Sequence, residues 1–385
     1  MSSTATTPAD TSVEYPSPVN SPPSSPIPSL PFDVVLNCVA RIPRCHHSTL
    51  SLVSKSFRSL LTSPDCYTLR SDLGFSEPLL HVCFSTPDLS SRWFTLRRTP
   101  HRTLHGATSM KSTGNRLVPV SSISSPTRLG SSVVAVGSEI YVIGGSIDGV
   151  PSSSVWVLDC RFHTWRRGPD MGEPREYAAA CDVEGKIHVI AGCESDKNKW
   201  VETFDLKTQS WESVTGKDTN LGGKRASGIA VFDGKVYFMD ERNNFFYDPK
   251  KGTLETAAQA GLFVHWRWGS RSWCVVGNEL YCCDTMGKIR GYDMEEGVWR
   301  EVKGVEALRK FLWLCAAMAC HGGKLVVFWY GHWDSGGRGK SEIWCAEIAL
   351  ERHSDGEIWG SVEWFDVVLT VDNMSQIPHS LTVSV

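Results

Sequence analysis

The first apolar pattern in the chain has the period of an α-helix. Between residues 30 and 61, apolar side chains recur at the spacing that places them on one helix face. Pro31 stands where a helix start tolerates a missing N–H, and Asp33 adds negative charge to the first turn. Pro43 ends the first predicted helix. A second predicted helix carries one stripe, made of Leu50, Val53, Phe57, Leu60 and Leu61. Two helices this short need another domain or another chain to cover their apolar faces.

From about residue 78 onwards, the pattern changes to short strands that repeat with a period in the forties. One unit contains four strand-like runs, at residues 132–136, 139–145, 154–159 and 163–166. The next unit reproduces their order, with Trp165 and Trp211 in equivalent places 46 residues apart. Four strands per repeat at this period predict a β-propeller with one blade per repeat. The Trp of each fourth strand is predicted to wedge between adjacent blades.

The two ends of the repeated region are predicted to share one blade. Five copies are visible, and residues 78–84 and 92–96 look like a second and third strand without a first. The alternating residues 380–385 have the pattern of the missing inner strand. Pairing them removes two sheet edges that would otherwise template aggregation. We therefore predict a small N-terminal α-helical domain followed by an all-β propeller of six blades, closed by the C-terminal strand; seven blades are the alternative.

Composition places the chain in the soluble globular class and excludes several functions. Hydrophobic residues make up 41% and charged residues 21%, with a net charge of −3. This charge gives no pull towards nucleic acid or an anionic membrane. The longest strongly apolar run, at residues 312–320, is too short to span a bilayer. The 13 cysteines, without a C-x-x-C, fit a reducing cytoplasm or nucleus, and no metal site is predicted.

Residues 1–26 form a Ser/Thr/Pro-rich segment with almost no aliphatic side chains. Such a segment cannot bury enough surface to offset its ordering entropy, so we expect a disordered tail. Its three Ser-Pro pairs are potential sites of proline-directed phosphorylation. A passive tail is the favoured interpretation.

Arginines recur in the segments that lead into the inner strands. Equivalent positions in a ring converge around one mouth of the channel, where guanidinium groups would bind an acidic or phosphorylated segment. Tryptophans accompany them, and this residue dominates many binding hot spots. The candidate substrate-binding residues are Arg128, Arg175, Arg225, Arg267, Trp268, Trp313 and Trp333. The alternative is that the arginines bond loop carbonyls and the tryptophans are blade wedges.

Together the two halves resemble the plant F-box proteins that carry kelch repeats. The first half of the resemblance is Leu30-Pro31 with its helix and the run Leu50–Leu61; the second is Gly144-Gly145 followed by Trp165. The resemblance implies that the F-box binds the Skp-type adaptor of a cullin–RING (SCF) ubiquitin ligase. The propeller would then capture a protein for ubiquitination. Carried over to this chain, the adaptor-binding residues are Leu30, Pro31, Leu36, Leu50, Val53, Lys55 and Phe57. The other interpretation is that this stripe only packs against the propeller.

The expected organisation is a tail (1–26), an F-box (27–70), a linker (71–77) and a kelch-repeat propeller (78–385). We expect a non-catalytic adaptor subunit without a cofactor, which binds neither nucleic acid nor membrane. One rival is a protein-interaction scaffold that builds no ligase. Another is a propeller enzyme, although the 12 histidines are scattered and no G-x-S-x-G, P-loop or H-E-x-x-H motif occurs. The sequence does not identify the substrate.

Overall fold

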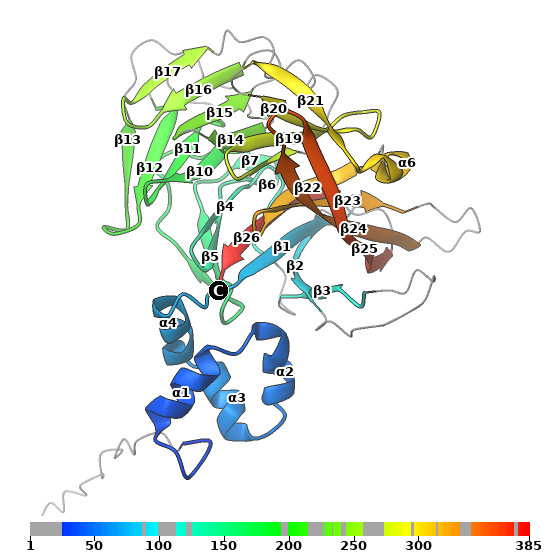
Figure 1. The fold of residues 1–385 in the computed structure, drawn as a ribbon. Coiled ribbons are helices and arrows are strands. Elements are labelled where there is room, and N and C mark those ends of the chain that lie inside the picture. The colour runs from blue at the N-terminus through cyan, green and yellow to red at the C-terminus, as the bar shows by residue number, and fades with distance from the viewer. Residues whose placement is uncertain are drawn as a thin grey trace, which may run out of the picture.

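The computed structural model shows a small helical unit attached to one end of a large β-propeller (Figure 1). The described residues are 25–86, 90–98, 113–120, 125–193, 199–214, 226, 228–232, 234–239, 244–256, 273–293, 296–312, 315–331, 340–372 and 376–385. The predicted disordered tail therefore lies, except for its last two residues, outside the described residues. None of the described helices is long and apolar enough to cross a membrane.

The helical unit has four α-helices and one 3-10 turn. They are α1 (Phe32–Ala40), η1 (Arg44–His46), α2 (His47–Leu50), α3 (Lys55–Leu61) and α4 (Pro64–Asp72). Helix α1 buries Val35 and Val39 in a cluster with Leu60, Leu61 and Cys66 of the later helices. Helix α4 thus covers, through Cys66, part of the apolar surface that two short helices alone would leave exposed.

The prediction of one continuous second helix through residues 50–61 was wrong. Helix α2 ends at Leu50, and a turn follows before Ser54 caps α3 by accepting a hydrogen bond from the Phe57 N–H at 3.1 Å. A serine in an extended conformation at this position is a strong helix start, and it interrupts the apolar stripe. As a result Val53 lies in the turn, 65% exposed, while Phe57 packs against the helical core.

Four antiparallel four-stranded sheets and one eight-stranded sheet form the propeller. The first sheet is β26 (Gln376–Ser384), β1 (Pro78–Ser85), β2 (Ser91–Arg97) and β3 (Arg116–Pro119). The second is β4 (Ser132–Val136), β5 (Glu139–Ile143), β8 (Val155–Asp159) and β9 (Thr164–Arg167). The third is β10 (Ala179–Val183), β11 (Lys186–Ile190), β12 (Val201–Asp205) and β13 (Ser210–Val214). The fourth is β14 (Gly228–Phe232), β15 (Lys235–Met239), β16 (Asn244–Asp248) and β17 (Thr253–Thr256).

The eight-stranded sheet joins two four-stranded units. One is β18 (Trp273–Val276), β19 (Glu279–Cys283), β20 (Ile289–Asp293) and β21 (Val298–Lys303). The other is β22 (Cys315–His321), β23 (Lys324–Tyr330), β24 (Lys340–Arg352) and β25 (Ile358–Asp372). A short parallel pairing of β21 with β25 connects them. Because these units share one hydrogen-bonded sheet, the count of six separate blades stays a prediction.

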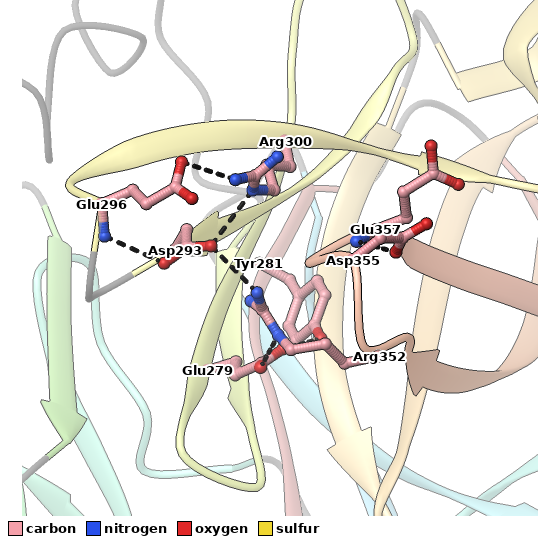
Figure 2. Close-up of polar contacts among 8 residues, drawn as sticks. All are labelled: Glu279, Tyr281, Asp293, Glu296, Arg300, Arg352, Asp355 and Glu357. Atoms are coloured by element: carbon pink, nitrogen blue, oxygen red, sulfur yellow. Dashed lines mark hydrogen bonds and ion pairs between the residues drawn. The ribbon is translucent and has the colours of Figure 1, made fainter.

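An ion-pair network reinforces this junction (Figure 2). The Asp293 carboxylate accepts hydrogen bonds from Arg300 of its own unit at 3.1 Å and from Arg352 of β24 at 3.0 Å. Arg352 also donates to Glu279, which accepts the hydroxyl of Tyr281 on its other oxygen. Burial and this hydrogen bond to the carboxylate raise the pKa of Tyr281. The network therefore links β19, β20, β21 and β24 through one largely buried carboxylate.

The inner strands form a closed ring. Contacts run from β26 to β4, β10, β14, β18 and β22, and from β22 back to β26. The C-terminal strand pairs with β1 in antiparallel register from Pro78↔Ser384 onwards, so the predicted closure by the chain's last strand is confirmed. Val383 is buried beside Ile140 of the second sheet, and Ile377 lies in a cluster with Leu80 and Val326. Strand β26 thus packs against both neighbouring blades.

One tryptophan of an outer strand packs between two blades as predicted. Trp211 of β13 packs on a cluster shared by the second and third sheets, which includes Tyr141 and Phe204. Its ring lies 5.0 Å from the Phe204 ring, and its Nε1–H donates to the Pro169 carbonyl at 2.9 Å. This single side chain therefore bridges two sheets by both apolar contact and a hydrogen bond.

Arg70 of α4 holds the helices to the propeller. Its buried guanidinium donates to the carbonyls of Ala40 and Ile42 at 2.8 and 2.7 Å, and to Glu77 at 2.9 Å. Glu77 in turn exchanges two backbone hydrogen bonds with the last residue, Val385, at 2.8 and 3.0 Å. This one arginine thus connects the end of α1 with the segment that carries the closing strand.

Tyr67, also on α4, inserts into the propeller. Its hydroxyl donates to the Arg161 carbonyl at 3.1 Å, and its ring meets Phe162 edge to face at 5.3 Å. Both partners lie in the turn between β8 and β9. Helix α4 is therefore the docking element, while α1, α2 and α3 extend away from the sheets (Figure 1).

Replacing Val383 with Asp should destabilise the whole propeller. Val383 is 2% exposed in the closing strand, and an uncompensated buried charge costs about 3–5 kcal/mol. The neighbouring Ser384 is exposed, so Ser384→Asp introduces the same charge in the same strand as a matched control. Urea unfolding should show a large decrease in the free energy of unfolding for Val383→Asp and little change for Ser384→Asp. Equal stabilities would contradict the closure by β26.

Stability should fall as the pH drops below 6.5. Burial lowers the pKa of His81, His188 and His321 from 6.5 to about 4. Between these values the unfolded chain binds more protons than the folded one. The free energy of unfolding therefore decreases with falling pH, by up to about 1.4 kcal/mol per pH unit for each ring, and is fully retained above 6.5.

Urea unfolding at several pH values measures this slope. His188→Gln should reduce the slope of the unfolding free energy against pH by the contribution of one histidine. His353→Gln, at an exposed position, should leave this slope unchanged. Identical slopes in all three proteins would show that His188 is not neutral in the fold.

Candidate functional site

The propeller has two ends with different surroundings. The helices occupy the end that carries the β4–β5 and β8–β9 turns, because Tyr67 contacts Arg161 and the Ser384 N–H donates to the Gly137 carbonyl. The opposite end carries the β5–β8 connection and the segments that lead from one blade into the next. Figure 1 shows the helices on one side only. The described segments that carry Arg128 and Arg175, before β4 and β10, therefore lie at the end away from the helices.

The predicted adaptor-binding residues fall into two groups. Leu30, Pro31, Val53 and Lys55 are exposed, whereas Leu36, Leu50 and Phe57 are half-buried against the helical core. None of the seven is among the residues of the clusters that contain propeller strands. The helical unit also exposes two apolar side chains that sequence reasoning missed, Leu52 at 78% and Val34 at 45%. Leu52 was missed because the turn between α2 and α3 was assigned to a helix.

Arg175 is a structural residue. It is 1% exposed, and its guanidinium pairs with the equally buried Glu202 of β12 at 3.0 Å. The remaining N–H groups donate to the carbonyls of Ala191, Lys199 and Trp200. Glu202 also accepts the N–H groups of Gly172 and Glu173. The hydrogen-bonding groups of the pair are thus engaged inside the blade. Arg175 therefore follows the alternative in which the recurring arginines bond loop carbonyls, and its guanidinium is not available to a ligand.

Arg128 holds the equivalent place in the second sheet and is exposed. Its backbone is fixed, since its N–H donates to Ser131 Oγ at 2.9 Å and that hydroxyl donates to the Gly144 carbonyl. Among the residues that the structure describes, its guanidinium has no hydrogen-bond or ion-pair partner. The backbone of Arg128 is therefore fixed, while its guanidinium is exposed to water.

The strand registers explain why these two arginines differ. Glu202 pairs with Val189 in the third sheet, and the corresponding pair in the second sheet is Trp156 with Val142. The carboxylate that neutralises Arg175 is therefore replaced by an indole in the blade of Arg128. Glu202 beside Val201 in a predicted strand was a sequence signal for a buried carboxylate, but its partner Arg175 became visible only through the fold.

The other predicted substrate residues lie outside the described residues: Arg225, Arg267, Trp268, Trp313 and Trp333. A surface pocket of about 520 Å³ occurs at the end of the propeller away from the helical unit. It lies between the β19–β20 turn and the segment formed by η3 (Glu306–Leu308) and α6 (Arg309–Leu312). Its lining includes Met286, Glu306, Arg309 and Lys310. Within the described part of the chain, no group of three or more His, Cys, Asp or Glu side chains is placed to hold a metal ion.

Replacing Arg175 with Gln should be far more damaging than the same change at Arg128. The first leaves the Glu202 carboxylate buried without its cation, which costs about 3–5 kcal/mol. The second removes an exposed, unpaired cation and should change stability by less than about 0.5 kcal/mol. Thermal and urea unfolding of the two single variants provide the measurement. A stability loss at Arg128 as large as that at Arg175 would contradict the assigned roles.

Comparison with known proteins agrees with this two-part architecture. Residues 93–369 match the family described as FKB95, Kelch-repeats domain, and residues 27–69 match the F-box domain. The chain is 43% identical to the F-box/kelch-repeat protein At4g39550 of Arabidopsis thaliana, over 94% of this chain and 95% of that protein. It is 38% identical to At4g19870 of the same plant, over 97% and 96% of the two chains, and 40% identical to At4g39580, over 92% and 93%.

These matches confirm the resemblance inferred from Leu30-Pro31, the run Leu50–Leu61 and the Gly144-Gly145 repeat. They cover the helical unit and most of the sheets, and the relatives extend over nearly the whole chain. The chain therefore belongs to the F-box/kelch-repeat protein family.

Proposed function

We propose that this protein is the substrate-recognition subunit of an SCF-type ubiquitin ligase. The observation that carries the proposal is the separation of two unoccupied surfaces. The helical unit exposes apolar side chains that the propeller does not cover, and the far end of the propeller exposes a different set. A subunit that joins a fixed adaptor to a variable protein needs both surfaces at once.

The adaptor would bind the helices α1, α2 and α3. Exposed aliphatic side chains there include Leu30, Val34, Leu52 and Val53. Several exposed aliphatic side chains on one small helical unit are typical of a protein interaction site, because a partner removes them from water. The half-buried Leu36, Leu50 and Phe57 would support that surface from beneath. Contact of α4 with the propeller leaves the other helices accessible.

The propeller would capture the protein to be ubiquitinated at the end away from the helices. This arrangement keeps a captured protein clear of the adaptor. The role requires no catalytic group in this chain, because the ligase supplies the chemistry through its other subunits. The proposal therefore treats this chain as a non-catalytic adaptor subunit.

Charge at the exposed helical surface should weaken adaptor binding strongly without unfolding the protein. We would test the double variant Leu30→Asp/Val53→Asp, whose side chains are 39% and 65% exposed in the native protein. Burying two carboxylates in an apolar interface should weaken co-purification with a Skp-type adaptor and cullin by at least about tenfold. These positions are better than Phe57, whose loss would also disturb the helical core.

Val298→Asp is the matched control, because Val298 is also exposed, at 44%, but lies on β21 of the propeller. It should co-purify like the native chain. If the native chain fails to bind the adaptor, or if the double variant binds as well as the control, the proposed function is wrong.

A further inference from the structure

A small hairpin projects from the propeller end that lies away from the helices. It consists of β6 (Ser146–Ile147) and β7 (Val150–Pro151). Asp148 and Gly149 form its turn with φ values of 52° and 82°, the conformation of a tight two-residue hairpin turn. Ile147 and Val150 face each other across this turn and are 46% and 64% exposed. The hairpin thus holds two aliphatic side chains in water.

Arg128 lies beside this hairpin. Leu129 bridges Ser146 in antiparallel fashion, so Arg128 stands across from Ile147 in the register. The Cβ of Arg128 also packs against Gly145, where a Cβ would come within 3.0 Å of it. The backbone and Cβ of Arg128 therefore lie against the base of the hairpin, so its exposed side chain starts close to the two exposed apolar side chains.

The environment of Arg128 differs from that of Arg175 by one missing carboxylate. Arg175 is neutralised by Glu202, whereas the corresponding strand position beside Arg128 is Trp156. Trp156 is itself engaged by Arg167, whose guanidinium lies 5.4 Å from the indole centroid. The blade that carries the exposed hairpin is thus the one in which the arginine lacks its internal acid.

We propose that Arg128, Ile147 and Val150 form a docking site for a protein segment that carries an Asp or Glu beside an aliphatic or aromatic side chain. The carboxylate pairs with the exposed guanidinium of Arg128, as the buried Glu202 pairs with the guanidinium of Arg175. The apolar side chain covers Ile147 and Val150. This inference rests on the proposed function, because it defines what the propeller captures.

The chemistry favours a carboxylate over a phosphate. A guanidinium binds either one bidentately, but a phosphate carries up to two negative charges. In the described part of this surface, Arg128 is the cation of the site. The equivalent Arg175 in the next blade is paired with the single carboxylate of Glu202. Ile147 and Val150 add exposed apolar surface beside the cation, and a purely acidic segment has no apolar side chain to bury it.

Selection of random twelve-residue peptides on the purified full-length chain tests the proposal. Enriched sequences should contain Asp or Glu next to Leu, Ile, Val or Phe. In fluorescence anisotropy, a selected peptide should bind Arg128→Glu at least about tenfold more weakly than the native chain. Ile147→Ser/Val150→Ser should weaken it similarly. Arg116→Glu, an equal charge change at an exposed position on β3, should bind like the native chain.

Several outcomes would overturn the inference. They are a selection without acidic enrichment, equal binding by the native chain and Arg128→Glu, and tighter binding when phosphoserine replaces the selected acid. Unchanged thermal unfolding of Arg128→Glu ensures that lost binding is not lost folding. Co-purification with the adaptor separates the two proposals: adaptor binding without acidic peptide binding contradicts this site alone, whereas the reverse contradicts only the ligase role.

Discussion

The antiparallel pairing of β26 with β1 is the constraint on which the rest of the structure depends. A ring of blades is stable only when no sheet edge and no apolar inter-blade face remains open. The closing strand meets both needs, since it pairs with β1 and packs beside β4 and β22. Val385, which follows this strand, also exchanges backbone hydrogen bonds with Glu77, whose carboxylate accepts a hydrogen bond from Arg70. The two ends of the propeller chain and the helical unit are thus joined at a single place.

This junction also determines how the two functional surfaces are oriented. Helix α4 binds the propeller through Tyr67 and Arg70, so the propeller covers the face of the helical unit that carries α4. The helices with exposed aliphatic side chains are left pointing away from the sheets (Figure 1). Because antiparallel strands alternate direction, every segment between blades emerges at the opposite end. The separation of the two surfaces therefore follows from the strand order and from one docking helix.

Repetition provides the frame, and departures from repetition provide individual sites. Arg128 and Arg175 occupy the same place in consecutive blades, yet one is exposed and the other is sealed by Glu202. A buried guanidinium without its carboxylate would be costly, so the blade with Trp156 in place of the acid leaves its arginine in water. One substitution within a repeat thus converts a structural residue into a candidate binding residue.

Much of this architecture was determined by the sequence itself. Helical and strand periodicity, turn glycines and recurring tryptophans are local signals, and they were sufficient to predict an N-terminal helical unit, an all-β propeller and its closing strand, but not helix α4. Local signals failed at the turn of Leu52 and Val53, where the cap formed by Ser54 outweighed the helical period. The sequence also placed Arg128 and Arg175 in one class. Only the tertiary structure separated them, because the partner that decides their burial lies on a strand 27 residues later in one blade and is absent from the other. Burial and pairing of a charge depend on neighbours brought together by folding, which no single segment encodes.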